Sequence, residues 1–191
     1  MERYPLSAII IADGRRLSAA DDAAPAGPDP RQLARAMAAV APVATDIVWV
    51  TADPAALLAQ DGLIVSDHHP PPDLLSAIHA GLFAARHDQA LVLAASQALP
   101  SGPVLALLLR SSAPRWDGVF LEAASMAQPL PALYHKRCLK LLARQLREGR
   151  RQVGGFLRQL HRHLIAEDLV RQADGQWAPL FPPEIRRPAE P

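Results

Sequence analysis

Two patterns of hydrophobic positions alternate along the chain. Short apolar runs predict buried strands, and these runs lie at Ala8–Ala12, Asp46–Thr51, Leu63–Val65, Ala90–Ala95, Gly118–Leu121 and Leu130–Tyr134. Between them, apolar residues recur every three or four positions, which predicts helices at Arg31–Val40, Pro54–Gln60, Leu74–Ala85, Pro103–Leu109, Lys136–Glu148 and Val153–Leu164. Strands that alternate with helices predict a three-layer α/β fold around a mostly parallel central sheet.

Ligands of such sheets bind just beyond the carboxyl ends of the strands. In this chain three segments follow predicted strands at that edge: Asp13–Arg16, Ser66–Asp73 and Ser96–Pro100. Candidate functional residues are therefore expected in these segments.

Length and composition narrow the classes of protein and partner. The chain has 191 residues, of which half are apolar and a fifth charged. This predicts one globular domain over residues 1–180, followed by a Pro-rich tail at 181–191. A net charge of +1 gives no reason to expect nucleic acid. No apolar stretch reaches the roughly 18 residues that would span a membrane. The single cysteine, Cys138, cannot form an internal disulfide, which favours a cytoplasmic protein and a structural thiol.

The first predicted strand ends in a turn rich in Gly and Arg. The segment Ser7–Arg16 reads SAIIIADGRR, a pattern typical of a strand that leads into a phosphate-binding loop. Nucleotide-binding candidates in this loop are Ala12, Asp13, Gly14, Arg15 and Arg16. No lysine precedes Lys136, and the Asp13 carboxylate would repel a triphosphate. Two like charges about 4 Å apart repel by about 1 kcal/mol in water and about 4 kcal/mol at an effective dielectric constant of 20. The alternative is an ordinary turn that carries solvent-facing charges.

The order of segments resembles that of a known family. Residues 128–139 read QPLPALYHKRCL and residues 146–153 read LREGRRQV. Molybdenum cofactor guanylyltransferases (MobA-like proteins), which join GMP to molybdopterin, carry a similar QPL-ALY-R strand, a helix and a G-RR turn. The resemblance extends in collinear order from about Ser7 to Arg186. It implies a Rossmann-like nucleotidyltransferase fold, with GTP and Mg²⁺ as ligands if activity is retained.

The chain departs from this family at the motifs that bind nucleotide. Asp13 replaces the first glycine of the family's loop, and the loop's Met-Gly pair and following lysine are missing. Asp67 matches an aspartate that the family places near the nucleotide. The Gly-Pro that begins the family's next helix is also missing from the segment at Asp73. Three histidines nearby are either exposed loop side chains or a metal cluster: His68, His69 and His79.

The family's magnesium ligand is also replaced. After the fourth strand the family reads Asp-Met-Pro, and this chain has Ser96 at the position of the aspartate. Mg²⁺ prefers one or two carboxylates together with phosphate oxygens, so no catalytic or metal-binding residue is predicted. Gln97 keeps a related cytidylyltransferase pattern open, since those enzymes read Asp-Gln-Pro. The family's closing segment is reduced to Leu180–Ile185 and lacks its asparagine.

These departures leave three hypotheses for the function. The first is a catalytically impaired scaffold that binds a molybdoenzyme, a cofactor-maturation protein or molybdopterin. The second is an active GTP- or CTP-dependent transferase with a rearranged site, and the third is an interaction module without a ligand. The first hypothesis predicts a partner or pterin face on the best-preserved segments. Its residues would be Gln128, Pro129, Tyr134, Arg147, Arg150 and Arg151, beside a basic stripe that also includes Lys136, Lys140 and Arg144. A solvated helix face is the alternative explanation of that stripe.

Overall fold

The computed structural model describes residues 5–12, 28–66, 69–70 and 72–179. Seven strands form one sheet in the order β3-β2-β1-β4-β6-β5-β7. Their bounds are Ser7–Ile11 (β1), Asp46–Val50 (β2), Leu63–Val65 (β3), Gln89–Ala94 (β4), Gly118–Ala123 (β5), Met126–His135 (β6) and Arg162–Ile165 (β7). All six strands predicted from the sequence are present, and β7 is an addition.

The sheet is mostly parallel, as predicted. Strands β3, β2, β1 and β4 pair in parallel, and β5 pairs in parallel with β7. Strand β6 alone among the described strands runs the opposite way, between β4 and β5. The amino end of β6 therefore lies at the same edge of the sheet as the carboxyl ends of the other strands.

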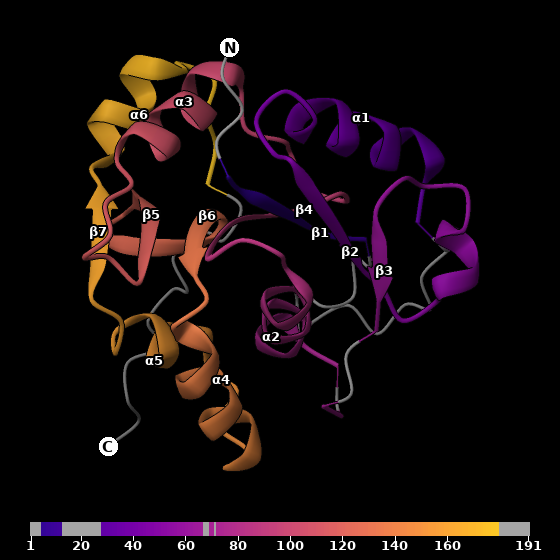
Figure 1. Cartoon of the computed structure of the whole chain (residues 1–191). Helices are drawn as coiled ribbons and strands as arrows, with labels where there is room; N and C mark the ends of the chain where they lie inside the picture. Colours follow the sequence, from indigo (N-terminus) through magenta and orange to yellow (C-terminus); the bar gives the residue numbers. More distant parts are fainter. Residues whose placement is uncertain (1–4, 13–27, 67–68, 71, 180–191) are drawn as a thin grey trace, which may run out of the picture.

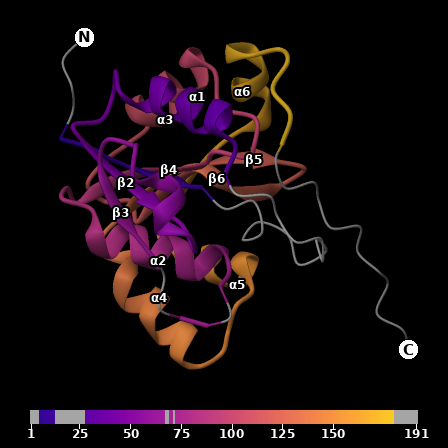
Figure 2. The ribbon, with the colours of Figure 1, turned by 90° about the vertical axis from the view of Figure 1, so that its right-hand side faces the viewer.

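Helices cover both faces of the sheet (Figures 1 and 2). On one side lie α1 (Pro30–Val40), α3 (Gly102–Arg110) and α6 (Glu167–Ala173), and on the other lie α2 (Leu74–Ala84), α4 (Cys138–Arg147) and α5 (Val153–Leu157). A short 3-10 helix, η2, occupies Pro54–Leu57. The expected three-layer α/β architecture is thus confirmed. Among the described residues, no helix is long and apolar enough to cross a membrane.

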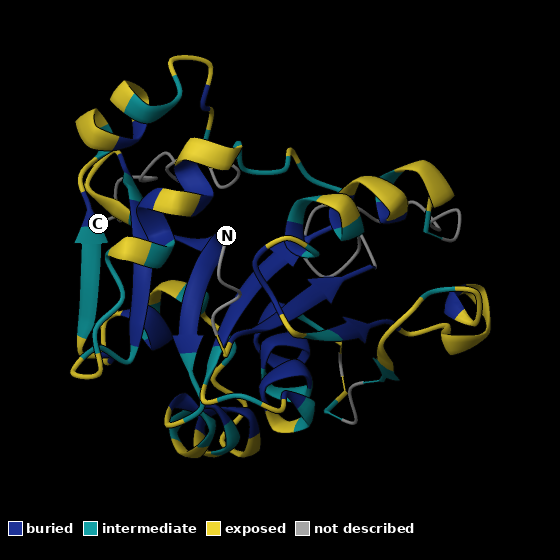
Figure 3. Cartoon of the chain, turned by 45° about the horizontal axis from the view of Figure 1, so that its top comes forward, coloured by how far each residue is buried: buried dark blue, intermediate teal, exposed yellow. Residues whose placement is uncertain are grey.

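Each face of the sheet has its own apolar core, and Figure 3 shows the central strands buried between exposed helix surfaces. The first core joins Leu33, Ala36 and Val40 of α1 to side chains of α3 and α6, and the second joins α2, α4 and α5. Gly81 lets α2 approach β1 closely, because a Cβ at this position would lie 2.4 Å from Cγ2 of Ile9. The close contact fixes the height of α2 over the sheet.

The prediction of one helix over Val153–Leu164 is wrong. Helix α5 ends at Leu157, and Arg162–Ile165 forms β7, which pairs with Gly118–Leu121 of β5. Two consecutive glycines, Gly154 and Gly155, weaken the helix. Pairing with the otherwise open edge of β5 then outweighs the helical preference of the later residues. Helix α4 begins two residues later than predicted, since the Lys136 amide N donates to O of Asp88 (2.7 Å).

Candidate functional site

The carboxyl edge of the sheet is held in register beyond the ends of the strands. The amide N of Ala12 donates to O of Val50 (2.9 Å), the N of Thr51 to O of Val65 (3.1 Å), and the N of Ala95 to O of Ile11 (2.9 Å). These bonds extend the parallel ladder by one residue at β1, β2 and β4. They give the loops that follow a fixed base at the edge where ligands bind in such sheets.

Most of the predicted nucleotide loop lies outside the described residues. Ala12 is buried at the end of β1. Asp13, Gly14, Arg15 and Arg16 follow it beyond the described segment, and so does Asp67 after β3. Their expected role in nucleotide binding stays a prediction.

Ser96 lies directly beyond β4, in the middle of the carboxyl edge. Its Oγ is buried and has no hydrogen-bond partner within the part of the chain that the structure describes. The same is true of Ser101 Oγ, five residues further on, which precedes α3 without capping it. The Ser96 hydroxyl offers a neutral oxygen at a position where the resemblance noted above implies a carboxylate.

The described carboxylates near this edge already have partners. Asp53 accepts from the amide N of Ala55 (3.2 Å) at the start of η2. Asp73 caps α2 by accepting from the N of Ser76 (2.7 Å), and its other oxygen lies 2.6 Å from Nη1 of Arg151. Asp73 is thus engaged by Arg151, whereas Asp53 is exposed and has one oxygen bonded to a backbone amide. The described residues contain no group of three or more His, Cys, Asp or Glu side chains that could hold a metal.

Two of the three histidines that the sequence offered as exposed loop side chains or a metal cluster, His69 and His79, contact each other. The ring centroids of His69 and His79 lie 4.9 Å apart, and His79 also stacks on the exposed Phe83 at 6.4 Å. Burial, and to a lesser extent His69, lowers the pKa of His79. His68 lies outside the described residues. The pair therefore packs as a partly buried aromatic contact.

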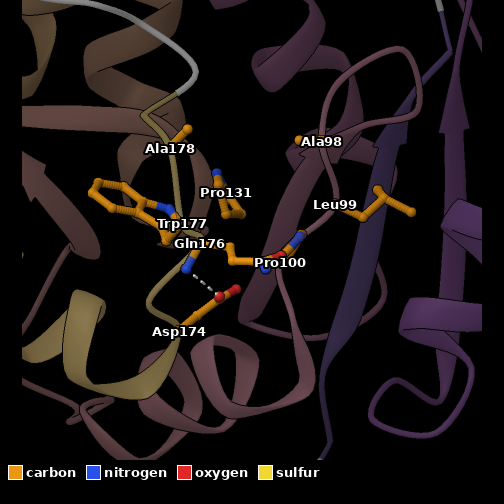
Figure 4. A pocket seen from close by; sticks show the side chains of 8 residues that line it. All are labelled: Ala98, Leu99, Pro100, Pro131, Asp174, Gln176, Trp177 and Ala178. Carbon is orange, nitrogen blue, oxygen red and sulfur yellow. Dashed lines mark hydrogen bonds between the residues drawn. The ribbon is translucent and has the colours of Figure 1, made fainter.

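A small pocket lies against residues 98–100, which follow β4 (Figure 4). It has a volume of about 110 Å³ and is lined by Ala98, Leu99, Pro100, Pro131, Asp174, Gln176, Trp177 and Ala178. Ligand pockets for molecules of nucleotide size usually exceed about 300 Å³. Sequence reasoning missed this pocket, because its far wall comes from the residues that follow α6, where no element was predicted.

The structure does not bring the predicted partner face together on one surface. Gln128 and Tyr134 are buried, with exposed fractions of only 1% each. The Tyr134 hydroxyl donates to O of Pro129 (2.8 Å), and its ring packs edge-on against Phe120. Burial raises the pKa of Tyr134 well above its ordinary value. These residues anchor β6 from inside, so a surface role is left to the arginines.

The residues of the predicted basic stripe also differ in their contacts. Lys136 Nζ donates to O of Ala85, Arg150 pairs with Glu148, and Arg151 binds both Asp73 and O of Pro70 (2.7 Å). Arg147 remains exposed, and its Nε contacts O of Ala143 (3.3 Å). A shallow groove of about 630 Å³ runs along the outer side of α4, lined by Arg137, Lys140, Leu141, Ala143, Arg144 and Arg147.

The single thiol of the chain, that of Cys138, has a structural role. Cys138 is buried at the start of α4, and its Sγ lies 3.3 Å from O of Asp117. Burial, together with the nearby Asp117 carboxylate, raises the pKa of the Cys138 thiol to about 12. A neutral buried thiol is a poor nucleophile, which agrees with the expectation from the sequence.

Known proteins share this fold and sequence pattern. A molybdenum cofactor guanylyltransferase from Desulfosudis oleivorans is 28% identical over 132 residues, which cover 69% of this chain. The chain spans about 65% of the length of that curated relative. A molybdopterin-guanine dinucleotide biosynthesis protein A from Archaeoglobus fulgidus superposes with a TM-score of 0.65 at 19% identity, over 89% of this chain and 87% of that one.

A second solved structure belongs to a different enzyme. The 2-C-methyl-D-erythritol 4-phosphate cytidylyltransferase of Thermus thermophilus superposes with a TM-score of 0.58 at 14% identity, over 83% of this chain and 87% of that one. At such identities the two structures establish the fold alone. The family described as the MobA-like NTP transferase domain matches residues 14–165, which is most of the chain. The protein therefore belongs to the family of MobA-like NTP transferase domains.

Proposed function

We propose that this protein acts in molybdenum cofactor guanylylation or molybdoenzyme maturation as a binding scaffold whose own nucleotide transfer is impaired. Family membership and the relative named molybdenum cofactor guanylyltransferase support the process. The impairment is argued from the residues of the carboxyl edge. A cytoplasmic location fits the single, buried thiol.

One observation carries the proposal, namely the hydroxyl of Ser96 at the end of β4. Phosphoryl transfer depends on neutralising the charge of the phosphates, usually with a carboxylate-bound Mg²⁺. Ser96 supplies no charge, and its Oγ is enclosed without a partner within the described part of the chain. Asp53 and Asp73 are engaged in helix caps and, for Asp73, with Arg151. Ser96 therefore supplies no charged ligand for Mg²⁺ at the end of β4.

The proposed binding role relies on the part of the molecule whose packing is intact. Strand β6 and helix α4 keep their packing, with Tyr134 bonded to Pro129 and Leu142 and Leu146 buried against α2 and α5. An intact framework, with a neutral hydroxyl at the end of β4, suits a protein that is retained for binding. Molybdopterin and a maturation protein are the two ligands of this scaffold that the proposal admits.

A transfer assay tests the proposal. Purified protein with GTP, molybdopterin and Mg²⁺ should release pyrophosphate far more slowly than the roughly 1 s⁻¹ of an ordinary enzyme. Turnover near that rate would contradict the proposal and favour the active GTP-dependent transferase. The same rate with CTP in place of GTP would favour the cytidylyl alternative.

Substitution at Ser96 separates the metal defect from the loop defects. Ser96→Asp should raise the affinity for Mg²⁺ by about tenfold or more, because one carboxylate is restored. Ser101→Asp is the matched control, since its Oγ is equally buried and unpartnered among the described residues but lies at the start of α3. We expect Ser96→Asp to leave turnover low because Asp13 and the missing lysine persist. Full recovery would show that the loop departures matter little.

A further inference from the structure

The outer side of α4 presents one continuous row of cations. The row consists of Arg137, Lys140, Arg144 and Arg147, all of them exposed. At 1.5 Å per residue these four positions extend over about 15 Å of one helix face. With Leu141 and Ala143 they line the groove of about 630 Å³, which is called the α4 basic groove below.

Few counter-ions lie near these charges in the described part of the chain. Arg137 lies 3.6 Å from Asp117, while no carboxylate of the described residues pairs with Lys140, Arg144 or Arg147. Neighbouring cations stand three or four positions apart, a spacing at which like charges destabilise a helix by about 0.2–0.5 kcal/mol per pair. The row therefore costs the isolated helix stability.

The helix dipole does not account for the row either. Arg144 and Arg147 lie in the last turn, where cations are favourable, but Lys140 and Arg137 lie at the positive end. The first turn of α4 has no acidic residue. Helix α6 shows the ordinary arrangement, with Glu167 in the first turn paired to Arg171 four residues later. The contrast indicates that the α4 charges serve something outside the helix.

We propose that the α4 basic groove docks an acidic amphipathic helix of a protein partner. Arginine forks pair with carboxylates in two-pronged contacts, and carboxylates one turn apart on the partner would match the row. Leu141 and Ala143 flank the row on its two sides and add apolar contacts, which suit a protein helix better than a bare phosphate. The inference rests on the proposed function and selects, of the two ligands that it admits, the protein partner.

Nucleic acid fits this surface less well. The whole chain has a net charge of +1, so the basic surface is local and short. Among the described residues, no aromatic side chain lines the groove to stack on a base. A duplex is therefore an outcome to be excluded by the experiment.

Binding of a designed peptide tests the groove without any nucleotide or pterin. The probe is a fluorescent helical peptide with Glu at positions i, i+3 and i+7 and a leucine beside them. Fluorescence anisotropy with the full chain at about 0.15 M salt should show saturable binding that weakens as salt rises. The triple reversal Lys140→Glu, Arg144→Glu and Arg147→Glu should weaken binding by about tenfold or more.

The matched control makes the same change of net charge elsewhere. Arg31, Arg35 and Arg158 are exposed and lie outside the groove, and their joint reversal to Glu should change binding less than about twofold. If the reversed groove variant does not fold, by circular dichroism, the corresponding triple change to Gln replaces it, with a loss of about fivefold or more expected.

Three results would overturn the proposal. They are no binding by the natural chain, an equal loss in the groove and control variants, and displacement of the peptide by pyrophosphate or duplex DNA at lower concentration than by unlabelled peptide. None of these results bears on the transfer assay, in which fast turnover would remove the proposed function and leave the groove untouched.

Discussion

The residues that directly follow three strands at the carboxyl edge of the sheet carry less charge than the outer face of α4. At the edge, the described residues that follow β1, β2 and β4 are Ala12, Thr51 and the Ala95–Ser96 pair, all of them uncharged. On α4, four cations stand on one face, and among the described residues only Arg137 has a carboxylate within 4 Å. In a nucleotidyltransferase fold, phosphate chemistry belongs to the edge. Among the described residues, the dense positive charge therefore lies on a helix face and not directly behind these three strands.

The two regions are nevertheless joined through α2. Asp73 caps the helix at the edge and binds Arg151, which follows α4. The body of α2 then packs against α4 in the second core. Substitutions in α2 and at the Arg151–Asp73 pair should therefore affect both regions, whereas substitutions elsewhere should affect only one of them.

The largest expected effect concerns Cys138, on the inner side of α4. Raising its pKa from 9.0 to about 12 lowers the thiolate fraction about a thousandfold. A thiol reagent at about pH 8 should modify the folded protein correspondingly more slowly than the denatured chain. Equal rates would show that the inner face of α4 is open. Because the folded state retains this proton, the free energy of unfolding should fall as the pH rises from about 9 to about 12.

A methyl group at Gly81 should disturb both regions through their shared helix. Gly81→Ala places a Cβ 2.4 Å from Cγ2 of buried Ile9, which should cost about 2 kcal/mol of unfolding free energy in denaturant titrations. Gly102→Ala is the control, since nothing lies within 4 Å of its added Cβ. It should be neutral or slightly stabilising. Equal effects of the two changes would mean that α2 does not approach β1 as described.

Breaking the link between the regions should cost less. Arg151→Gln removes the partner of Asp73, and both side chains are about three-quarters buried, with 22% and 24% exposed. We expect a loss of about 1–2 kcal/mol in the free energy of unfolding. Arg150→Gln breaks the exposed pair with Glu148 and should cost less than about 0.5 kcal/mol. A larger loss of unfolding free energy for Arg150→Gln than for Arg151→Gln would contradict the conclusion that the Arg151–Asp73 pair joins the two regions.

The smallest effect tests whether the row on α4 is maintained at the expense of stability. Lys140→Gln relieves repulsion from Arg137 and Arg144, so the free energy of unfolding should rise by about 0.2–0.5 kcal/mol. The gain should shrink in about 1 M salt, where charges are screened over about 3 Å. A loss of stability at low salt would show that Lys140 has a structural role.

The sequence predicted the fold better than the surfaces. Apolar runs such as Ala90–Ala95 identify buried parallel strands because both of their faces are covered. Strand β7 was missed because its pattern continues that of α5, and its pairing with the open edge of β5 is a non-local contact. Tyr134 was placed on the surface because a polar hydroxyl in the sequence does not reveal that Pro129 satisfies it internally.

The position of Ser96 in the fold was easier to predict than the partners of the arginines. Ser96 was expected at the end of the fourth strand, and it lies there. Which arginines are free was not predictable, because Arg151 pairs with Asp73 across 78 positions of sequence. Such pairs depend on how α2 and α4 meet in three dimensions.

Calorimetric titration with GTP, with and without Mg²⁺, tests the central claim most directly. The claim is that the carboxyl edge lacks the charge to hold a metal-bound triphosphate, because Ser96 stands at the end of β4. We predict weak GTP binding that Mg²⁺ does not strengthen in the natural chain, and a gain with Mg²⁺ in Ser96→Asp. Micromolar GTP binding that requires Mg²⁺ in the natural chain would contradict the account.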